Sequence, residues 1–378
     1  MAAWKRWLTT SARVSIFNLT TLSSSALVNF NEGRDQLFAT ASLSAGYDSN
    51  IFASDAGKGD VVTTGSLRLE YLRRAGLIGV NGAVEWTQGS FASNPSEDFS
   101  DPSLSLELVK ESGRTTGSFT LTGNRQSKAD PALNQRTVSW NLAAGLNVKY
   151  PVIRRYSVTG TLGYGLLKYT EKSSELADLR TVSAGSDLFY AYTSERDLLV
   201  GYRIRQSDTS ANNQSVDHSI TGGVSGKIIS KLRGSIRAGY QIREEGASGS
   251  TFGSTTASAS VTWAVNRRFT ITGTVSKDFG TTAYESSTDN LSFNLDAQYV
   301  IRNRWSLYAG LGFGYSDYLN GTDIGRSDYY GSWSFGPSYE LNEHFKASLT
   351  YSYFQNWSSS SIANFDRHTL TLNLTSRW

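Results

Sequence analysis

The sequence predicts an all-β fold, namely a transmembrane antiparallel up-and-down β-barrel of about eighteen strands, with about sixteen as the alternative. Polar and apolar residues alternate along nearly the whole chain, as they do in strands that have one apolar face. The alternating segments are roughly ten to fifteen residues long, which is enough to cross a bilayer at a steep tilt. Their polar faces carry mostly small, uncharged side chains, as a polar barrel interior requires.

The C-terminal segment shows this alternation most clearly. One parity carries Leu370, Leu372 and Leu374 and ends on Trp378. The other parity carries threonines and Asn373. Because successive side chains of a strand point to opposite faces, this segment has one apolar face and one polar face.

Composition excludes several other classes of protein. The 378 residues would suffice for two or three soluble domains or one large barrel. Only 39% of the residues are hydrophobic, and no long apolar run is present, so a bundle of transmembrane helices is excluded. The chain has no cysteine, which removes disulfides and thiolate metal sites. The net charge is only +3 and the basic residues are dispersed, so we expect no nucleic-acid partner, and no motif indicates a cofactor or a metal site.

The first 35 residues are expected to form a separate N-terminal segment. Lys5 and Arg6 precede a moderately apolar stretch over residues 14–30, and Ser24-Ser25-Ala26 resembles a signal-peptide cleavage site. A cleaved signal peptide is the expectation, and a start codon assigned at the wrong position is the alternative. Residues 36–378 are then predicted to form a single barrel.

Turns divide the barrel region from Leu37 onward. Short turns, one of them at Tyr150-Pro151-Val152, alternate with longer loops, one of them at residues 126–135. This is the arrangement of bacterial outer-membrane barrels, which have short periplasmic turns and longer extracellular loops. Because an unpaired backbone N–H or C=O is costly in hydrocarbon, the first strand, near residues 37–52, is predicted to pair with the last.

The predicted inward faces consist mainly of Ser, Thr, Gly and Asn, which are too small to fill a barrel of this size. A basic group is superimposed on them in three consecutive strands. Its members are Arg203, Arg205, Lys227, Arg233, Arg237 and Arg243. Asp187, on the preceding strand, is expected to lie opposite Arg203. Charges on a pore wall tune ion selectivity, so these are the candidate pore-lining residues. The alternative is that the arginines only brace the wall by pairing with Asp187, Glu70 and Glu85.

Catalysis is not expected. The chain has three histidines. His218 and His368 stand beside Asp217 and Asp366 at loop-side strand starts, and His344 lies in a short turn. An outer-membrane hydrolase with such a rim Asp-His pair is the weakest of the functional alternatives, since a hydrolase needs an acid, a base and a nucleophile within hydrogen-bond reach.

The segment Ala45-Gly46-Tyr47-Asp48-Ser49-Asn50-Ile51-Phe52 resembles the opening motif of a family of bacterial outer-membrane β-barrel porins. Members often accompany exopolysaccharide synthesis or export genes. The resemblance implies an outer-membrane location, outer-membrane lipid and lipopolysaccharide as surroundings, and insertion by the barrel-assembly machinery, whose signal the terminal Trp378 resembles. The leading expectation is a porin-like channel for passive passage of small polar or saccharide solutes. The alternative is a non-conducting component of an exopolysaccharide export system that contacts other export proteins.

Overall fold

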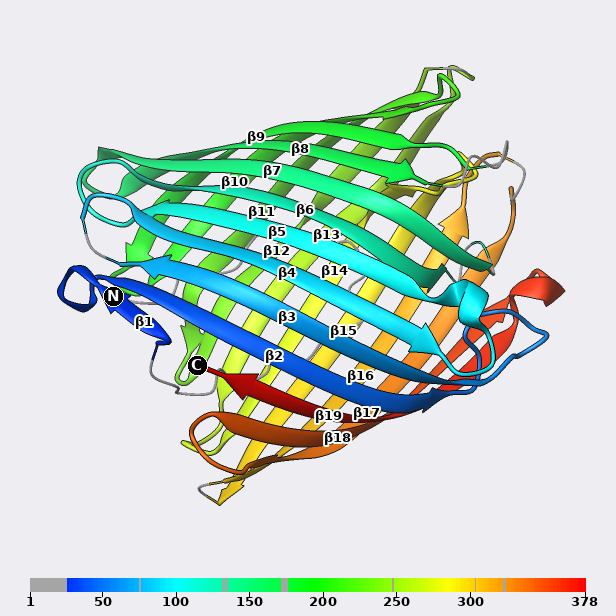
Figure 1. Cartoon of the computed structure of the whole chain (residues 1–378). Helices are drawn as coiled ribbons and strands as arrows, with labels where there is room; N and C mark the ends of the chain where they lie inside the picture. Colours follow the sequence, from blue (N-terminus) through cyan, green and yellow to red (C-terminus); the bar gives the residue numbers. More distant parts are fainter. Residues whose placement is uncertain are drawn as a thin grey trace.

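A computed structural model describes residues 26–74, 76–130, 133, 135–170, 176–246, 248–302, 304–321 and 324–378. Most of the expected signal peptide, with the residues before the cleavage point, lies outside these ranges. Within them, three short 3₁₀ turns occur, at Asn31–Gly33, Pro95–Glu97 and Ser361–Ala363. The strands form one antiparallel sheet that closes into a barrel (Figure 1).

The strands are β1 (Val28–Phe30), β2 (Asp35–Asp48), β3 (Asp60–Arg73), β4 (Gly79–Phe91), β5 (Phe99–Lys110), β6 (Thr116–Asp130), β7 (Gln135–Ile153), β8 (Tyr156–Tyr169), β9 (Leu179–Thr193), β10 (Arg196–Thr209), β11 (Gln214–Ile229), β12 (Leu232–Glu245), β13 (Thr251–Ala264), β14 (Phe269–Thr281), β15 (Ser287–Arg302), β16 (Trp305–Tyr318), β17 (Ser327–Glu340), β18 (Phe345–Ser358) and β19 (Phe365–Arg377). In the described part of the chain, the eighteen strands β2 to β19 make up the ring, which confirms the predicted fold.

The ring closes where β19 pairs with β2. Their register runs from Thr369 opposite Asp48 to Arg377 opposite Thr40. The terminal Trp378 continues it, since its N–H and C=O each bond to Ala39 at 2.9 Å. The short β1 pairs with the start of β2, next to the point where the chain ends, and both ends of the described chain lie at the same end of the barrel (Figure 1).

Side chains follow the predicted parity. The exposed apolar side chains, which face lipid, include Leu43, Val84, Leu142, Leu311 and Leu372. The opposite parity carries Ser44, Asn141, Gly312 and Thr371. A strand with one apolar and one polar face is stable only where the two faces meet different solvents, here lipid and the barrel interior.

Two predicted boundaries are wrong. Strand β7 continues through Pro151 to Ile153, so the turn lies at Arg154 and Arg155. Pro151 lies beyond Lys149, the last residue of β7 that pairs with β6, and beside the register shift between β7 and β8, and strands tolerate proline at such positions. The second error is the long loop expected at residues 126–135, because β6 extends to Asp130.

The lipid and interior faces can be tested by one pair of variants. Leu142→Arg places a charge on the lipid face near the middle of β7 and should lower the stability of the folded barrel by about 2–4 kcal/mol. Asn141→Arg, one residue away on the interior face, should be tolerated. Urea unfolding in lipid vesicles, followed by the gel-mobility difference between folded and unfolded barrel, measures both. Equal damage from the two substitutions would contradict the register.

Candidate functional site

The candidate site is the interior of the barrel. Between the β15, β16 and β17 strands its wall is built from Asn294, Gly312 and Ser332, which face one another in register. Hydroxyl groups bond along the wall, as between Ser306 and Ser338, whose Oγ atoms are 2.7 Å apart. Small hydroxyl and amide side chains leave space inside a ring of this many strands.

A buried ion-pair cluster interrupts this polar wall. Arg205, Asp217 and Arg243 stand directly opposite one another on β10, β11 and β12. Arg205 Nη2 and Arg243 Nε lie 2.5 and 2.6 Å from the carboxylate oxygens of Asp217. The side chains of Arg243 and Asp217 are 1% and 3% exposed, so both charges are removed from water. Planar guanidinium groups suit such shared carboxylates.

Asp278 of β14 extends the cluster. Its carboxylate accepts hydrogen bonds from Arg203 Nη2 at 2.8 Å and from Arg205 Nη1 at 3.2 Å. Strands β11 to β13 separate Asp278 from these arginines in the ring. The end of β14 therefore approaches β10 through the interior and not along the sheet.

Asp187 does not pair with Arg203, contrary to the sequence expectation. It stands opposite Gly201 on β10, and its carboxylate accepts two hydrogen bonds from Arg237 Nη1 of β12, at 3.0 and 2.9 Å. The missing side chain of Gly201 makes this reach possible, because a Cβ there would lie 2.0 Å from Asp187 Oδ1. The sequence order suggested the nearest strand, whereas a long arginine spans several strands.

The remaining basic candidates lie toward the short-turn end. Lys227 Nζ is 2.8 Å from Glu195 Oε2, and this hydrogen bond lowers the pKa of the Glu195 carboxyl below its usual value. Arg233 is exposed. Glu70 and Glu85, considered as partners of this basic group, instead pair with Arg377 and Arg68 at 3.3 and 3.4 Å.

Two hairpins bend inward at the end of the barrel that carries the longer loops, called here the loop end. The ladder between β5 and β6 stops at Ser103 and Asn124, and the ladder between β13 and β14 stops at Ala257 and Lys277, although all four strands continue. Beyond each stop, the β6–β7 hairpin and the β14–β15 hairpin leave their neighbouring strand. Pro102, which has no N–H to donate, stands at the first position past the ladder on β5.

The side chains show that both hairpins lie inside the wall. Arg125 has the lipid parity of β6, yet its Nη1 is 2.8 Å from Asp101 Oδ1, which has the interior parity of β5. Likewise Asp289 has the lipid parity of β15, yet it accepts a hydrogen bond at 2.6 Å from Ser254, which faces the interior from β13. In each case the lipid-parity face of the hairpin covers the inner face of the strand it has left.

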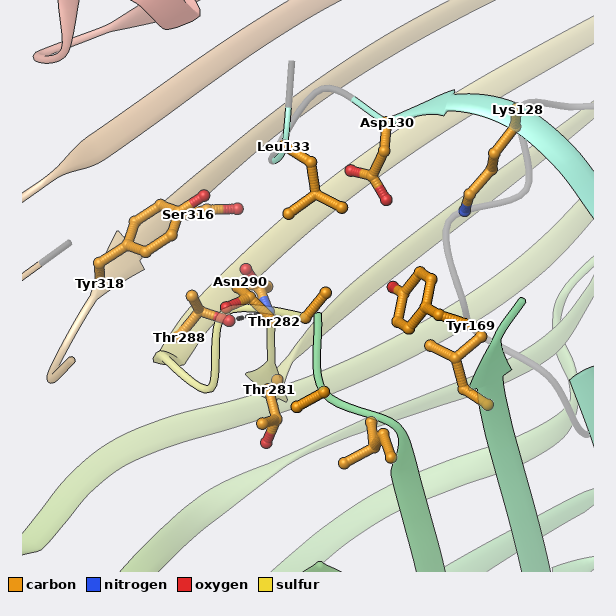
Figure 2. A pocket seen from close by; sticks show the side chains of 15 residues that line it. Lys128, Asp130, Leu133, Tyr169, Thr281, Thr282, Thr288, Asn290, Ser316 and Tyr318 are labelled. Carbon is orange, nitrogen blue, oxygen red and sulfur yellow. Dashed lines mark hydrogen bonds between the residues drawn. The ribbon is translucent and has the colours of Figure 1, made fainter. Parts of the chain in front are cut away.

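The two hairpins meet across the opening of the barrel at its loop end, called here the mouth. Leu133, between β6 and β7, packs with Tyr169 at the end of β8 and with Ala283, between β14 and β15. The adjoining cavity has a volume of about 270 Å³, and Leu133, Leu167, Ala177 and Ala283 line it with apolar surface. Figure 2 shows this cavity from close by. The hydroxyl and amide groups on its lining belong to Tyr169, Thr281, Thr282, Thr288, Asn290, Ser316 and Tyr318. Lys128 and Asp130 also border it, so the cavity is amphipathic.

The three histidines lie on β11, on β19 and in the turn between β17 and β18. His218 accompanies Asp217 in sequence, but the two point to opposite faces, and His218 Nδ1 lies 2.7 Å from Tyr202 Oη. His368 Nε2 does approach Asp366 Oδ2, at 3.2 Å, on the lipid-parity face of β19. Its Nδ1 is 2.6 Å from Tyr351 Oη. His344 lies in the predicted short turn, where its ring stacks on Trp378 at 3.9 Å.

The described residues contain no group of three or more His, Cys, Asp or Glu side chains that could hold a metal ion. No helix in the same part of the chain is long and apolar enough to cross a membrane.

The inward hairpins were not predicted from the sequence, although a signal was present. Arg125, Lys277 and Asp289 are charged residues on the lipid parity of otherwise apolar faces. A charged side chain at a lipid-facing position is unfavourable, so such residues indicate strand ends that lie outside the lipid, either inside the barrel or beyond the bilayer.

Comparisons with known proteins agree with this architecture. The family described as putative beta-barrel porin 2 matches residues 214–378, the C-terminal part of the chain. The crystal structure of OpdK from Pseudomonas aeruginosa with vanillate aligns with a TM-score of 0.51 at 12% identity, over 90% of this chain and 99% of that one. OccK9 (OpdG) from the same organism gives 0.50 at 12% identity, over 90% and 98%. No curated protein matches the sequence.

The fold is that of the outer-membrane porins. The family model and the porin fold place the protein in the bacterial outer membrane. Its strand length and lipid-facing parity agree with a barrel that spans a bilayer. At 12% identity, the likeness to OpdK concerns the fold alone.

The buried cluster yields a stability prediction. Asp217→Ala leaves Arg205 and Arg243 without their shared carboxylate, and breaking a buried ion pair from one side costs about 3–5 kcal/mol. Asp366→Ala removes an exposed carboxylate and should cost about 0–1 kcal/mol. Urea unfolding in vesicles measures both. A barrel that tolerates Asp217→Ala as well as Asp366→Ala would show that the cluster does not brace the wall.

Proposed function

We propose that the protein is an outer-membrane channel for the passive passage of small polar solutes, saccharides among them. The observation that carries the proposal is the interior of the ring, whose wall is lined by small hydroxyl and amide groups. Most of its candidate charged groups are paired, with Asp187 and Asp217 in the wall, with Asp278 of the inward hairpin and with Glu195 in the turn between β9 and β10.

Paired charges favour neutral solutes. An ion pair presents little net charge to a passing solute, so it neither concentrates nor repels ions strongly. Hydroxyl and amide groups can replace the hydrogen bonds that a polyhydroxylated solute makes with water. The cavity between the hairpins adds apolar surface and the rings of Tyr169 and Tyr318 to such groups. This mixture suits the two kinds of surface on a sugar ring.

OpdK was crystallised with vanillate, a small organic solute. The shared ring architecture supports a channel of comparable type here, and the solute follows from this chain's own interior. Of the residues predicted to line the pore, Arg203, Arg205, Lys227, Arg233, Arg237 and Asp187 remain proposed as pore-lining, whereas Arg243 is 1% exposed and braces the wall. Their pairing predicts weak ion selectivity in the intact protein.

Planar-bilayer recording and liposome swelling test the proposal together. The purified protein should conduct ions with a reversal potential near zero in a salt gradient. Proteoliposomes should swell in neutral mono- and disaccharides faster than protein-free liposomes do. A folded protein that neither conducts nor admits sugars would reject the channel and favour a non-conducting component of an exopolysaccharide export system.

The Asp187–Arg237 pair gives a sharper prediction. Asp187→Asn leaves the Arg237 guanidinium without its counter-charge inside the barrel, so the reversal potential should move toward anion preference. The shift should be largest at low ionic strength, since exposed charges are screened beyond about 8–10 Å at physiological salt. The double variant Asp187→Asn/Arg237→Gln restores neutrality and should return to the wild-type value. A shift in both variants would show that the pair acts through structure and not charge.

We propose that Trp378 is recognised by the barrel-assembly machinery during insertion. Its indole is 45% exposed and stacks on His344, while its backbone completes the closing ladder. Trp378→Ala keeps that backbone pairing and should reduce insertion into the outer membrane. His344→Ala removes the stacking partner but keeps the aromatic residue, and should insert normally. Pulse-chase fractionation measures both, and equal defects would mean that the stack alone matters.

A further inference from the structure

The tip of the β14–β15 hairpin, residues 278–289, has a second set of backbone partners available. The ladder between β13 and β14 ends at the pair Ala257 and Lys277. Residues 251–256 of β13 and 278–281 of β14 are strand residues beyond that pair. If the same register continued, Thr255 would stand opposite Phe279. Residues 278–281 could therefore pair with residues 251–256 without any change of register.

In the observed position the tip lies against the inner wall. Phe279 has the lipid parity of β14, yet only 3% of it is exposed. Its ring lies 5.1 Å from the guanidinium of Arg243, which faces the interior from β12. Ser287, also of lipid parity, donates to Glu245 Oε1 at 2.5 Å and accepts from Arg243 Nη1 at 2.9 Å.

Arginine side chains take the place of the missing ladder. The carbonyl oxygens of Phe279 and Gly280 accept hydrogen bonds from Arg205 Nη2 and Arg243 Nη1, at 2.7 and 2.5 Å. Successive carbonyls of a strand point toward opposite neighbours, so one of these two guanidiniums stands where an N–H of β13 would bond. The Asp278 carboxylate is held at the same time by Arg203 and Arg205.

The tip also contacts residues next to β9 and at the end of β10. The carbonyl oxygen of Ala283 accepts a hydrogen bond at 2.9 Å from the N–H of Ala177, ahead of β9. Glu285 Oε1 accepts one at 2.9 Å from Thr209 Oγ1, at the end of β10. An outward movement of the tip would break these two hydrogen bonds and the packing of Leu133 on Ala283, in addition to the contacts with the inner wall.

We propose that this hairpin tip is a gate with two discrete positions. In the inward position Arg203, Arg205 and Arg243 hold it across the mouth. In the outward position residues 278–281 pair with residues 251–256 of β13, completing the wall, and Phe279 faces outward beside Thr255. The inference rests on the proposed channel function and adds a closing device to it.

Two positions follow because each provides partners for the same backbone groups. Inward, guanidinium donors satisfy the carbonyls of Phe279 and Gly280. Outward, an N–H of β13 does so for the one of these two carbonyls that points toward β13. A position between the two would leave that carbonyl unpaired, which is costly away from water. Such alternative packings of one segment give a switch between states and not a continuous range of openings.

Cysteine pairs can trap each position, because the chain contains no cysteine of its own. Ser254→Cys/Asp289→Cys joins side chains that touch in the inward position. Thr255→Cys/Phe279→Cys joins side chains that now lie on opposite sides of the wall and would face each other only in the outward position. Val261→Cys/Gly273→Cys lies in the paired part of the ladder and is the matched control.

We expect all three pairs to oxidise in outer-membrane vesicles, as read by mass spectrometry of cross-linked peptides. Single-channel conductance should fall in the Ser254/Asp289 pair, rise in the Thr255/Phe279 pair and stay unchanged in the control, and reductant should reverse both changes. A Thr255/Phe279 pair that stays reduced while the other two oxidise would overturn the gate. So would two gate pairs that oxidise without changing conductance.

The cross-linking readout needs no current, so it separates this inference from the proposed function. A non-conducting wild-type protein would reject the channel and with it the role of the tip as a gate, while the movement itself would still be judged by the Thr255/Phe279 cross-link.

A charge variant tests the lock directly. Asp278→Asn weakens the contacts to Arg203 and Arg205, whose ion pairs with Asp278 are partly buried, and should raise the ratio of open to closed dwell times by about threefold or more. Asp296→Asn makes the same charge change on β15, where the carboxylate accepts a hydroxyl hydrogen bond from Tyr308 and no arginine is involved. Equal dwell-time ratios in Asp278→Asn and wild type would overturn the lock.

Discussion

The constraint on which the whole structure depends is backbone hydrogen bonding in a medium without water. Every N–H and C=O that crosses the hydrocarbon needs a partner in the protein, so the sheet has to close. The pairing of β19 with β2, carried to its last residue by Trp378 and Ala39, is that closure. Strand length, tilt and the alternation of lipid-facing and interior residues all follow from the closed ring.

The same constraint explains where the ladder is allowed to break. Both interruptions, between β5 and β6 and between β13 and β14, lie at the loop end of the strands, where side chains can replace a neighbouring strand. Arg125 donates to the carbonyl oxygen of Ser100, and the N–H of Ser127 donates to Asp101 Oδ2, each at 2.8 Å. The freed backbone groups are thus satisfied inside the protein, as irregular structure at membrane depth requires.

The sequence was sufficient to predict the ring of strands but not the arrangement of the hairpins at its mouth. Period-two alternation, as in Leu370, Leu372 and Leu374, fixes which face of a strand meets lipid, because that choice is local. The partners of Asp187 and Asp278 are set by distances across several strands, and alternation carries no information about them. Lys277 and Asp289 break the apolar parity and mark the strand ends that turn inward. Charge on the lipid parity also occurs at other strand ends, as at Asp366 of β19, so it does not by itself distinguish the β14–β15 hairpin.

The inward hairpins also decide how the interior charges act. If the end of β14 had stayed in the wall, Asp278 would lie three strands from β11. Arg203 and Arg205 would then face the interior without Asp278, and Arg205 and Arg243 would share Asp217 alone. Bringing Asp278 across the mouth neutralises this group and closes contacts with β9 and β10 in the same step. The neutralisation of the interior arginines and the width of the mouth therefore depend on the same movement of the hairpin. Any change that moves the hairpin outward must also unmask positive charge on the interior wall.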